Sequence, residues 1–308
     1  MDTRFGAYIS LAGGFVLAGS SVIAGKFLVG LPVFFAAAAG TAIALLVLVP
    51  LAAGETRPER GAMRRALPFF AAQAFFGVAL FRVLMLAALS RTSASEAGIA
   101  TGVTPVITAL LSALFLRERI GLRAALGIGL AAAGIVALES GAGVETVAPI
   151  AHFASRHLVG CFLALGAAAS ESAFNVLSKR LEASIGPKRA SASVMAIALV
   201  LLATLSLVTG EKVELNAISP NRGLAFVYQG LFASALAYVL WFTGVAKVPV
   251  STAGVFSGFM PLSSFALSAL VLGERPRPAA YAGCLLAIGG ILLCASPHRV
   301  KDEGRVPA

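Results

Sequence analysis

Long apolar segments follow one another along almost the whole 308-residue chain, and they restrict its possible folds more than any other feature. A helix needs roughly 20 mostly apolar residues to cross the hydrocarbon core of a bilayer. Charged or Pro/Gly-rich joints separate ten such segments, which comprise residues 6–25, 31–53, 67–89, 94–116, 122–140, 158–178, 190–209, 223–245, 250–272 and 279–296. The sequence therefore predicts an all-α integral membrane bundle of ten transmembrane helices.

The charge of the chain fits this assignment. Only 12% of the residues are charged, against about 25% in a typical soluble protein. The formal net charge of +10 does not indicate a nucleic-acid partner, because Lys and Arg of a multi-pass protein usually gather in its cytoplasmic loops. With ten spans, most of the 24 Lys and Arg residues fall at the termini and in the even-numbered joints. We therefore expect both termini to be cytoplasmic and the lipid bilayer to surround the chain.

Two distant segments share an unusual pattern. Residues 98–119 and 254–275 both read Gly-x-x-x-Gly-x-x-Pro, followed by an apolar run and Glu-Arg. A constant offset of 156 positions, applied without a gap to residues 68–135, also aligns Gln73 with Gln229. We interpret the chain as an internal duplication. The longest joint separates an N-terminal five-helix repeat, 1–146, from a C-terminal five-helix repeat, 147–308.

An odd number of spans in each repeat has a topological consequence. The second repeat must enter the membrane upside down relative to the first, as in many secondary transporters, whose substrate site lies near the midplane between inverted repeats. A membrane scaffold or sensor subunit is the alternative. An enzyme is not expected, because the spans carry no His/Asp/Glu cluster and no nucleophile-base pair. Three isolated cysteines indicate neither a metal site nor a disulfide framework, and no cofactor is expected.

The repeated Gly and Pro residues predict irregular helices. Proline removes one backbone hydrogen bond and frees a carbonyl four residues earlier. Such a freed group is tolerated in a membrane only against protein or a water-filled cavity. We interpret four residues as hinges of a transport pathway, and a plain packing kink is the alternative. They are Gly102, Pro105, Gly258 and Pro261.

Polar and aromatic side chains on two helical faces are the candidate substrate-binding residues. Residues at i, i+4 and i+7 share a face, which groups Ser234, Tyr238 and Trp241. An interfacial aromatic belt is the alternative for the two aromatic residues. The offset of 156 places Arg82 opposite Tyr238. Arg82 either grips a substrate carboxylate through two parallel hydrogen bonds or extends outward to the interface.

Glu171 and Asn175 share a face of the sixth span with Ser178. An ionisable residue inside a span is costly and is a functional candidate by default. Three roles stay open for Glu171, which are binding a substrate ammonium, carrying a coupling proton, and pairing with Arg82 for structural reasons. Gln73 and Gln229 lie on other faces, so we expect them in interhelical hydrogen bonds rather than in substrate contacts.

The paired motifs, with small residues before a mid-span Pro and a Gly-rich helix after Glu-Arg, resemble the drug/metabolite transporter superfamily of the ten-helix EamA type. Within it the chain most resembles the YddG amino-acid exporters. The resemblance implies an inner-membrane exporter of amino acids or similar small zwitterions, working by alternating access through a central cavity between the repeats. The fifth and tenth helices would be scaffold. A multidrug or organic-cation exporter is the alternative, and a monomer is the simplest assembly. Many members carry an Arg in the second span, where this chain has Gly40 and Thr41.

Overall fold

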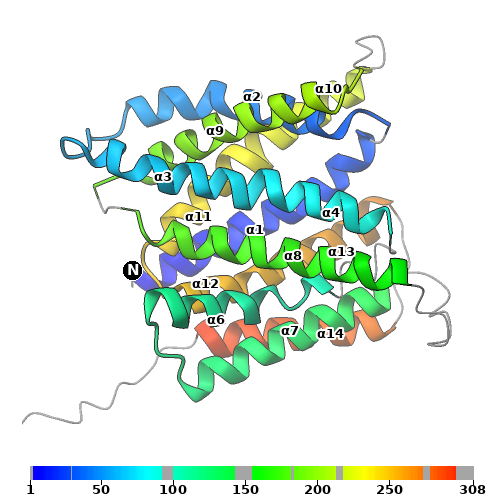
Figure 1. Ribbon diagram of the computed structural model, residues 1–308. Coiled ribbons are helices and arrows are strands. Elements are labelled where there is room, and N and C mark those ends of the chain that lie inside the picture. Colours follow the sequence, from blue (N-terminus) through cyan, green and yellow to red (C-terminus); the bar gives the residue numbers. More distant parts are fainter. Residues whose placement is uncertain are drawn as a thin grey trace, which may run out of the picture.

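The computed structural model describes residues 3–28, 30–91, 100–142, 155–181, 184–212, 218–272 and 278–295 (Figure 1). Within these ranges every regular element is a helix. Seven helices are long and apolar enough to cross a membrane, and three shorter apolar helices accompany them, at Thr104–Leu116, Leu122–Leu138 and Ala280–Ala295. The fold is therefore an all-helical bundle suited to a bilayer.

The first part of the chain builds five rods. They are α1 (Thr3–Phe27), α2 (Val33–Ala53), a composite rod of α3 (Ala62–Ala74), π-helix η1 (Phe75–Leu80) and α4 (Phe81–Leu89), then α6 (Thr104–Leu116) and α7 (Leu122–Ala142). Their ends lie within about five residues of the predicted segments except at 94–116. There, residues 92–99, including Gly98, lie outside the described residues, and a turn at Gly102 and Val103 precedes α6.

The second part follows the same order. It contains α8 (Ser155–Ser178), α9 (Pro187–Val208), a rod of α10 (Pro220–Tyr228), π-helix η4 (Gln229–Leu236) and α11 (Ala237–Val245), a rod of α12 (Val250–Val255), 3-10 helix η5 (Phe256–Gly258) and α13 (Phe259–Leu272), and α14 (Pro278–Ala295). The repeated Glu274 and Arg275, and the predicted repeat boundary at 146 and 147, lie outside the described residues.

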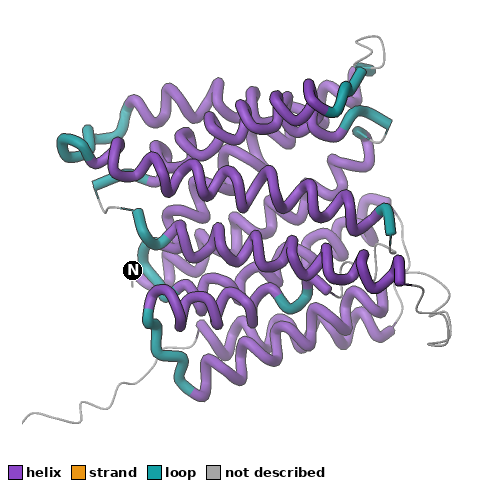
Figure 2. The backbone as a smooth tube through the Cα atoms, in the orientation of Figure 1, coloured by secondary structure: helices purple, strands orange, loops and turns teal. Residues whose placement is uncertain are grey.

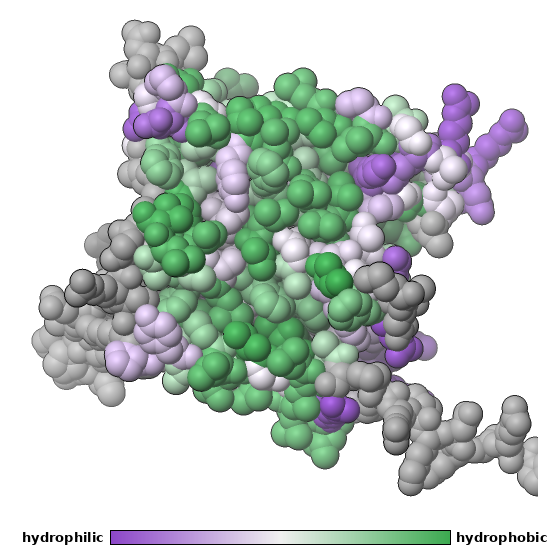
Figure 3. Space-filling view, turned by 180° about the vertical axis from the view of Figure 1, so that it is seen from behind, coloured by the Kyte–Doolittle hydropathy of each residue, from purple (hydrophilic) through white to green (hydrophobic). Residues whose placement is uncertain are grey.

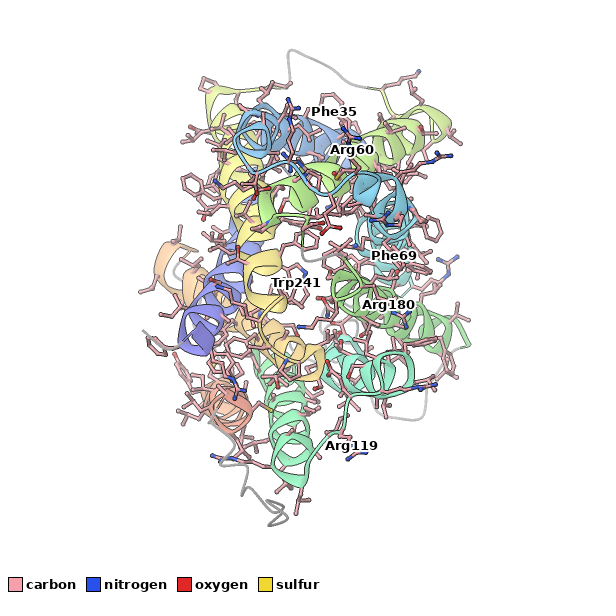
Figure 4. The ribbon with its side chains drawn as sticks, turned by 90° about the vertical axis from the view of Figure 1, so that its left-hand side faces the viewer. Phe35, Arg60, Phe69, Arg119, Arg180 and Trp241 are labelled. Atoms are coloured by element: carbon pink, nitrogen blue, oxygen red, sulfur yellow. The ribbon has the colours of Figure 1, made fainter. Side chains whose placement is uncertain are left out.

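The rods lie side by side (Figures 1 and 2). The start of α1 and the joints that follow α2, α6, α8 and α11 lie at the same end of the bundle. Arg60, Arg119 and Arg180 mark this end in Figure 4, and Figure 3 shows hydrophilic residues gathered there beside a broad apolar surface. Leu46, Leu207 and Leu270 are 76–82% exposed, as expected of side chains that face lipid.

Two glutamates tie α2 and α9 together at both ends. Glu55, which follows α2, accepts hydrogen bonds of 3.0 Å from the backbone N–H groups of Lys188 and Arg189 at the start of α9. Glu211, which follows α9, accepts bonds of 2.9 and 2.8 Å from the first turn of α2. A carboxylate at a helix N-terminus satisfies unpaired N–H groups and favours the helix dipole. These reciprocal caps mean that α2 and α9 are antiparallel, and the two glutamates are 156 positions apart.

Glycines allow α7 and α14 to pack in close contact. A Cβ on Gly134 would overlap the backbone of Ala287, and a Cβ on Gly283 would overlap that of Leu138. Close approach through small residues is a common means of helix association in lipid. Gly127 and Gly290 meet in the same way, so the two helices also run antiparallel.

Each part of the chain contains a π-helix at a corresponding place. An offset of 156 carries η1 onto residues 231–236, which belong to η4. The wide turn leaves backbone carbonyls to be satisfied from elsewhere, and Ser170 of α8 donates a 2.7 Å hydrogen bond to the Phe76 carbonyl. π-Helical turns within α-helices are frequent at functional sites.

Both Pro motifs coincide with irregular backbone. Pro105 lies at the start of α6, and Thr104 donates a 2.6 Å hydrogen bond to the Thr101 carbonyl, the group that the proline was predicted to free. Pro261 follows η5, where α12 gives way to α13. Gly258 faces side chains of the α7–α14 pair, Ile135 and Ile291.

Candidate functional site

A cavity of about 380 Å³ lies inside the bundle. Residues of α1, α2, α8, α9 and α13 line it, together with residues of the two rods that contain η1 and η4. All six sequence-predicted binding residues are among the lining residues, which are Arg82, Glu171, Asn175, Ser234, Tyr238 and Trp241. Figure 4 places Trp241 in the interior, seen from the end of the bundle that carries Arg60 and Arg180. The structure thus brings both predicted faces to one site.

Charged side chains of opposite sign enter this cavity from different helices. Arg82 belongs to α4 and Glu171 to α8, and the phenol of Tyr238 on α11 interacts electrostatically with both. Within the described part of the chain, no ion pair joins Arg82 to Glu171. The structure therefore gives no support to a purely structural pairing, and it places Arg82 at the cavity rather than at the outer surface.

Asn175 is held by a neighbouring helix. Its side chain is 2% exposed, and Nδ2 donates a 3.4 Å hydrogen bond to the Thr108 hydroxyl on α6. Thr108 donates in turn to Ser172 at 3.0 Å, so a small polar network links α6 to α8. Networks of this kind fix side-chain orientation, and here the network presents one edge of Asn175 to the cavity.

Aromatic rings form one wall of the cavity. Trp241 stacks on Phe174 with ring centroids 6.0 Å apart and meets the edge of Phe15 at 5.4 Å. Its indole nitrogen donates a 3.1 Å hydrogen bond to Ser178. At 6% exposed, Trp241 does not belong to an interfacial belt, so that alternative is wrong for this residue. The wall supplies a flat apolar surface beside the two charges.

The sequence alone did not predict every residue of the site, and it predicted a different role for some of them. Gln229 makes the expected interhelical hydrogen bond, from Nε2 to the Ser21 carbonyl at 3.3 Å, but it also lines the cavity. Gln73 is fully buried and accepts from Ser178 at 3.3 Å. Phe15 and Phe174 were not singled out, because nothing in the sequence distinguishes them among 20 phenylalanines.

Other residues bear on the shape of the site. Gly40 and Thr41, at the place where the resemblance implies an arginine in many members, both line the cavity. A Cβ on Gly77 would overlap the ring of Phe174, so Gly77 leaves room for the aromatic wall. None of the hinge candidates Gly102, Pro105, Gly258 and Pro261 is among the described lining residues, although Met260 is. The hinge interpretation stays a prediction.

Lys179 and Glu118 connect four segments at the end of the bundle where α6, α8 and α11 end. The Lys179 ammonium donates hydrogen bonds of 2.8 Å to the Val245 and Val248 carbonyls at the end of α11. Glu118 accepts bonds of 2.7 and 3.0 Å from the first turn of α12. Partial burial lowers the pKa of Lys179, and Glu118 acts in the opposite direction. A cation at a helix C-terminus and an anion at a helix N-terminus both favour the helix dipoles.

The lining residues of the cavity can bind a small ligand. Among the described residues no group of three or more His, Cys, Asp and Glu could hold a metal ion. What the cavity offers instead is one cationic and one anionic side chain, amide and hydroxyl groups, and an aromatic wall. These groups suit a small polar ligand whose charges are separated.

Comparisons with known proteins find similarity to transporters. The model of the EamA-like transporter family matches two segments, residues 4–139 and 158–296. The uncharacterized transporter YetK of Bacillus subtilis is 30% identical over 97% of this chain and 89% of its own length. A probable terminal-alkyne amino-acid exporter of Streptantibioticus cattleyicolor is 26% identical over 83% of each chain. A solved crystal structure with 23% identity covers 94% of this chain and 96% of its own, with a TM-score of 0.78, and so shares the fold.

Proposed function

The chain belongs to the EamA-like transporter family, and we propose that it exports amino acids or similar small zwitterionic metabolites by alternating access through the cavity. The observation that carries this proposal is the presence of Arg82 and Glu171 in one cavity without an ion pair between them. Two opposite charges held apart match the carboxylate and ammonium of a zwitterion. The relative named as an amino-acid exporter adds support.

Each end of such a substrate has a partner. The guanidinium of Arg82 can hold a carboxylate through two parallel hydrogen bonds. Glu171 can bind the ammonium, and the phenol of Tyr238 interacts electrostatically with both charges. Phe174 and Trp241 offer a flat surface to an apolar side chain, and Asn175 and Ser234 add polar groups. The proposal assigns the chain no catalytic step.

The proposed architecture is ten spans in two inverted five-helix repeats, 1–146 and 147–308. The reciprocal caps of Glu55 and Glu211 support it, because each repeat supplies the other with the same contact. The glycine contacts between α7 and α14, the corresponding π-helices and the two segments matched by the family model point the same way. The cavity then lies between the repeats, as in other transporters of this design.

We place the protein in a bacterial inner membrane, as a monomer with both termini cytoplasmic. Arg60, Arg119 and Arg180 lie at the end of the bundle where α1 begins (Figure 4), which supports this orientation. Reporter fusions test it. A reporter that works only in the periplasm should be inactive at both termini. Activity at either terminus would contradict the proposed orientation.

Transport by purified protein in liposomes tests the function. We expect counterflow of labelled amino acids above that of protein-free liposomes, measured over a panel that varies side-chain size and charge. The panel should be run with and without an imposed proton gradient, because a gradient effect would separate coupled transport at Glu171 from facilitated export. Absence of flux for every amino acid would contradict the proposal.

Two other outcomes have their own readouts. An organic-cation exporter is favoured by Glu171 beside an aromatic wall, which attracts quaternary ammonium groups. It would transport cationic drugs and no amino acid. A scaffold or sensor subunit would move neither class of compound and would purify with a stable partner.

A further inference from the structure

A second hollow lies on the side of the bundle. It is a groove of about 470 Å³ with walls from α1 and α14, and with η5 and the start of α13 between them. Phe256, only 3% exposed, forms its inner side, whereas Ile9 and Leu292 at its borders are 53% and 62% exposed. Since the borders are apolar and exposed, the groove opens toward the lipid.

The groove is charged at one end. Arg4 lines it where α1 begins, at the end of the bundle where Figure 4 shows Arg60, Arg119 and Arg180. Tyr8 and Ala12 follow on the same face of α1, so the groove extends along this helix over the roughly 12 Å that separate the backbone positions of Arg4 and Ala12. Its other lining residues are apolar or aromatic. A ligand that fits must be anionic at one end and apolar along the rest of its length.

We propose that this groove binds one anionic phospholipid of the cytoplasmic leaflet. The phosphate lies against the Arg4 guanidinium, which hydrogen-bonds phosphate oxygens in a fork. One acyl chain lies along Ile9, Phe256 and Ile291. A basic side chain near an anionic headgroup contributes an attraction that a zwitterionic headgroup of the same size does not provide.

The bound chain touches an irregular part of the fold. Phe256 is the first residue of η5 and Phe259 follows η5; their ring centroids are 5.9 Å apart, and Phe256 stacks on Tyr8 at 5.5 Å. An acyl chain in the groove therefore packs against the segment that joins α12 to α13, next to Pro261. The choice of leaflet rests on the proposed orientation of the protein. The site itself lies on the outer surface of the bundle, so it stands apart from the choice of substrate for the central cavity.

Native mass spectrometry of the full chain tests the headgroup contact. Protein exchanged from detergent into equal amounts of phosphatidylglycerol and phosphatidylcholine should retain one phosphatidylglycerol. Arg4→Gln should lower that preference about fivefold. Arg60→Gln is the matched control, since Arg60 is exposed at the same end but does not line the groove, and its preference should equal that of the wild type.

A second variant tests the apolar part. Ala12→Phe places a ring inside the groove and should remove retention of both lipids, whereas Leu270→Phe, on an 82% exposed position elsewhere, should leave retention unchanged. Far-ultraviolet circular dichroism checks that each variant is folded. Equal retention of the two lipids by the wild type, undiminished retention by folded Ala12→Phe, or a dimer in place of a lipid adduct would overturn the proposal.

Discussion

The indole nitrogen of Trp241 donates a 3.1 Å hydrogen bond to the hydroxyl of Ser178, and this contact joins α11 to the last residue of α8. Ser178 also lies 3.3 Å from Gln73 Oε1, to which it donates. The ring of Trp241 is thus held at its edge by a hydrogen bond and on its face by Phe174. This arrangement positions the aromatic wall of the cavity.

Ser178→Ala should loosen that wall. The substitution leaves the buried indole N–H without its acceptor, which costs about 1–3 kcal/mol. We expect acrylamide to quench the tryptophan emission severalfold more strongly, together with a severalfold rise in apparent KM. Trp241 is the only Trp in the chain, so the signal reports on this site alone. Thr204→Ala, whose hydroxyl bonds within α9, is the control, and equal quenching in all three proteins would refute the positioning role.

Arg82→Lys and Arg82→Ala should differ in their effect on export. Lysine keeps the charge but loses the forked geometry, so we expect the apparent KM for amino acids to rise about tenfold. Alanine removes the carboxylate partner and should reduce flux roughly a hundredfold, with both variants inserted and folded. Counterflow assays measure both values.

Arg91→Ala serves as the matched control, since Arg91 is exposed and its guanidinium donates to Ala87 and Ser90 at the end of its own helix. Its flux should remain near wild type. Wild-type flux in Arg82→Ala would show that Arg82 does not hold the substrate.

Glu55→Ala and Glu211→Ala should destabilise the protein to a similar extent. Each removes the acceptor of two backbone N–H groups at the start of a span, a loss of about 1–2 kcal/mol. Thermal unfolding in detergent should detect the lower midpoint. Glu59→Ala alters an exposed glutamate in the same joint as Glu55 and should have no effect. A midpoint unchanged in both cap variants would contradict the importance of the caps.

Gly134→Ala should be more damaging than its small size suggests. The added methyl overlaps the backbone of Ala287, and backbone atoms cannot move aside without separating α7 from α14. Overpacking of this kind costs about 1–3 kcal/mol. Gly129→Ala lies on the same helix with open space around its Cβ position and should leave the unfolding midpoint unchanged or slightly raised. Equal midpoints in the two variants would argue against close packing.

Pro105→Ala and Pro261→Ala test the hinge interpretation. Each substitution permits a continuous hydrogen-bond ladder at a place where the backbone is irregular, so transport should slow severalfold while insertion is retained. Pro50→Ala, inside α2 and away from both motifs, controls for a general effect of removing a helical proline. Wild-type transport rates in both motif variants would rule out the hinge interpretation and leave only the packing kink.

The helices were predictable because a bilayer imposes their length and composition. Helix α12 begins at Val250 and α7 at Leu122, as the hydropathy breaks indicated. The π-helices η1 and η4 were not predictable. Apolar composition does not distinguish backbone hydrogen bonds between residues five apart, as in a π-helix, from those between residues four apart, as in an α-helix. The turn at Gly102 and Val103 followed the predicted effect of Pro105, but the end of the preceding helix could not be located from hydropathy.

The cavity was predictable in part, through helical faces and the repeat offset. Tyr238 and Trp241 share the α-helical register of α11, so spacing sufficed to group them. Gln229 lies in η4, where bonds from i to i+5 shift the register and bring it to the same cavity as Ser234. Phe174 depends on Gly77 across the helix interface, a contact that no spacing within one helix can reveal.

The reciprocal caps also determine when α2 can be capped during translation. Glu211, which accepts a hydrogen bond from the Phe34 N–H, lies 177 residues later in the chain. Because a ribosome adds about 5–20 residues per second, Glu211 is made roughly 10 to 35 s after Phe34. During that interval the first N–H groups of α2 must bond to water, lipid headgroups or the insertion machinery. A chain that ends before Glu211 therefore lacks the acceptor for the Phe34 and Phe35 N–H groups at the start of α2.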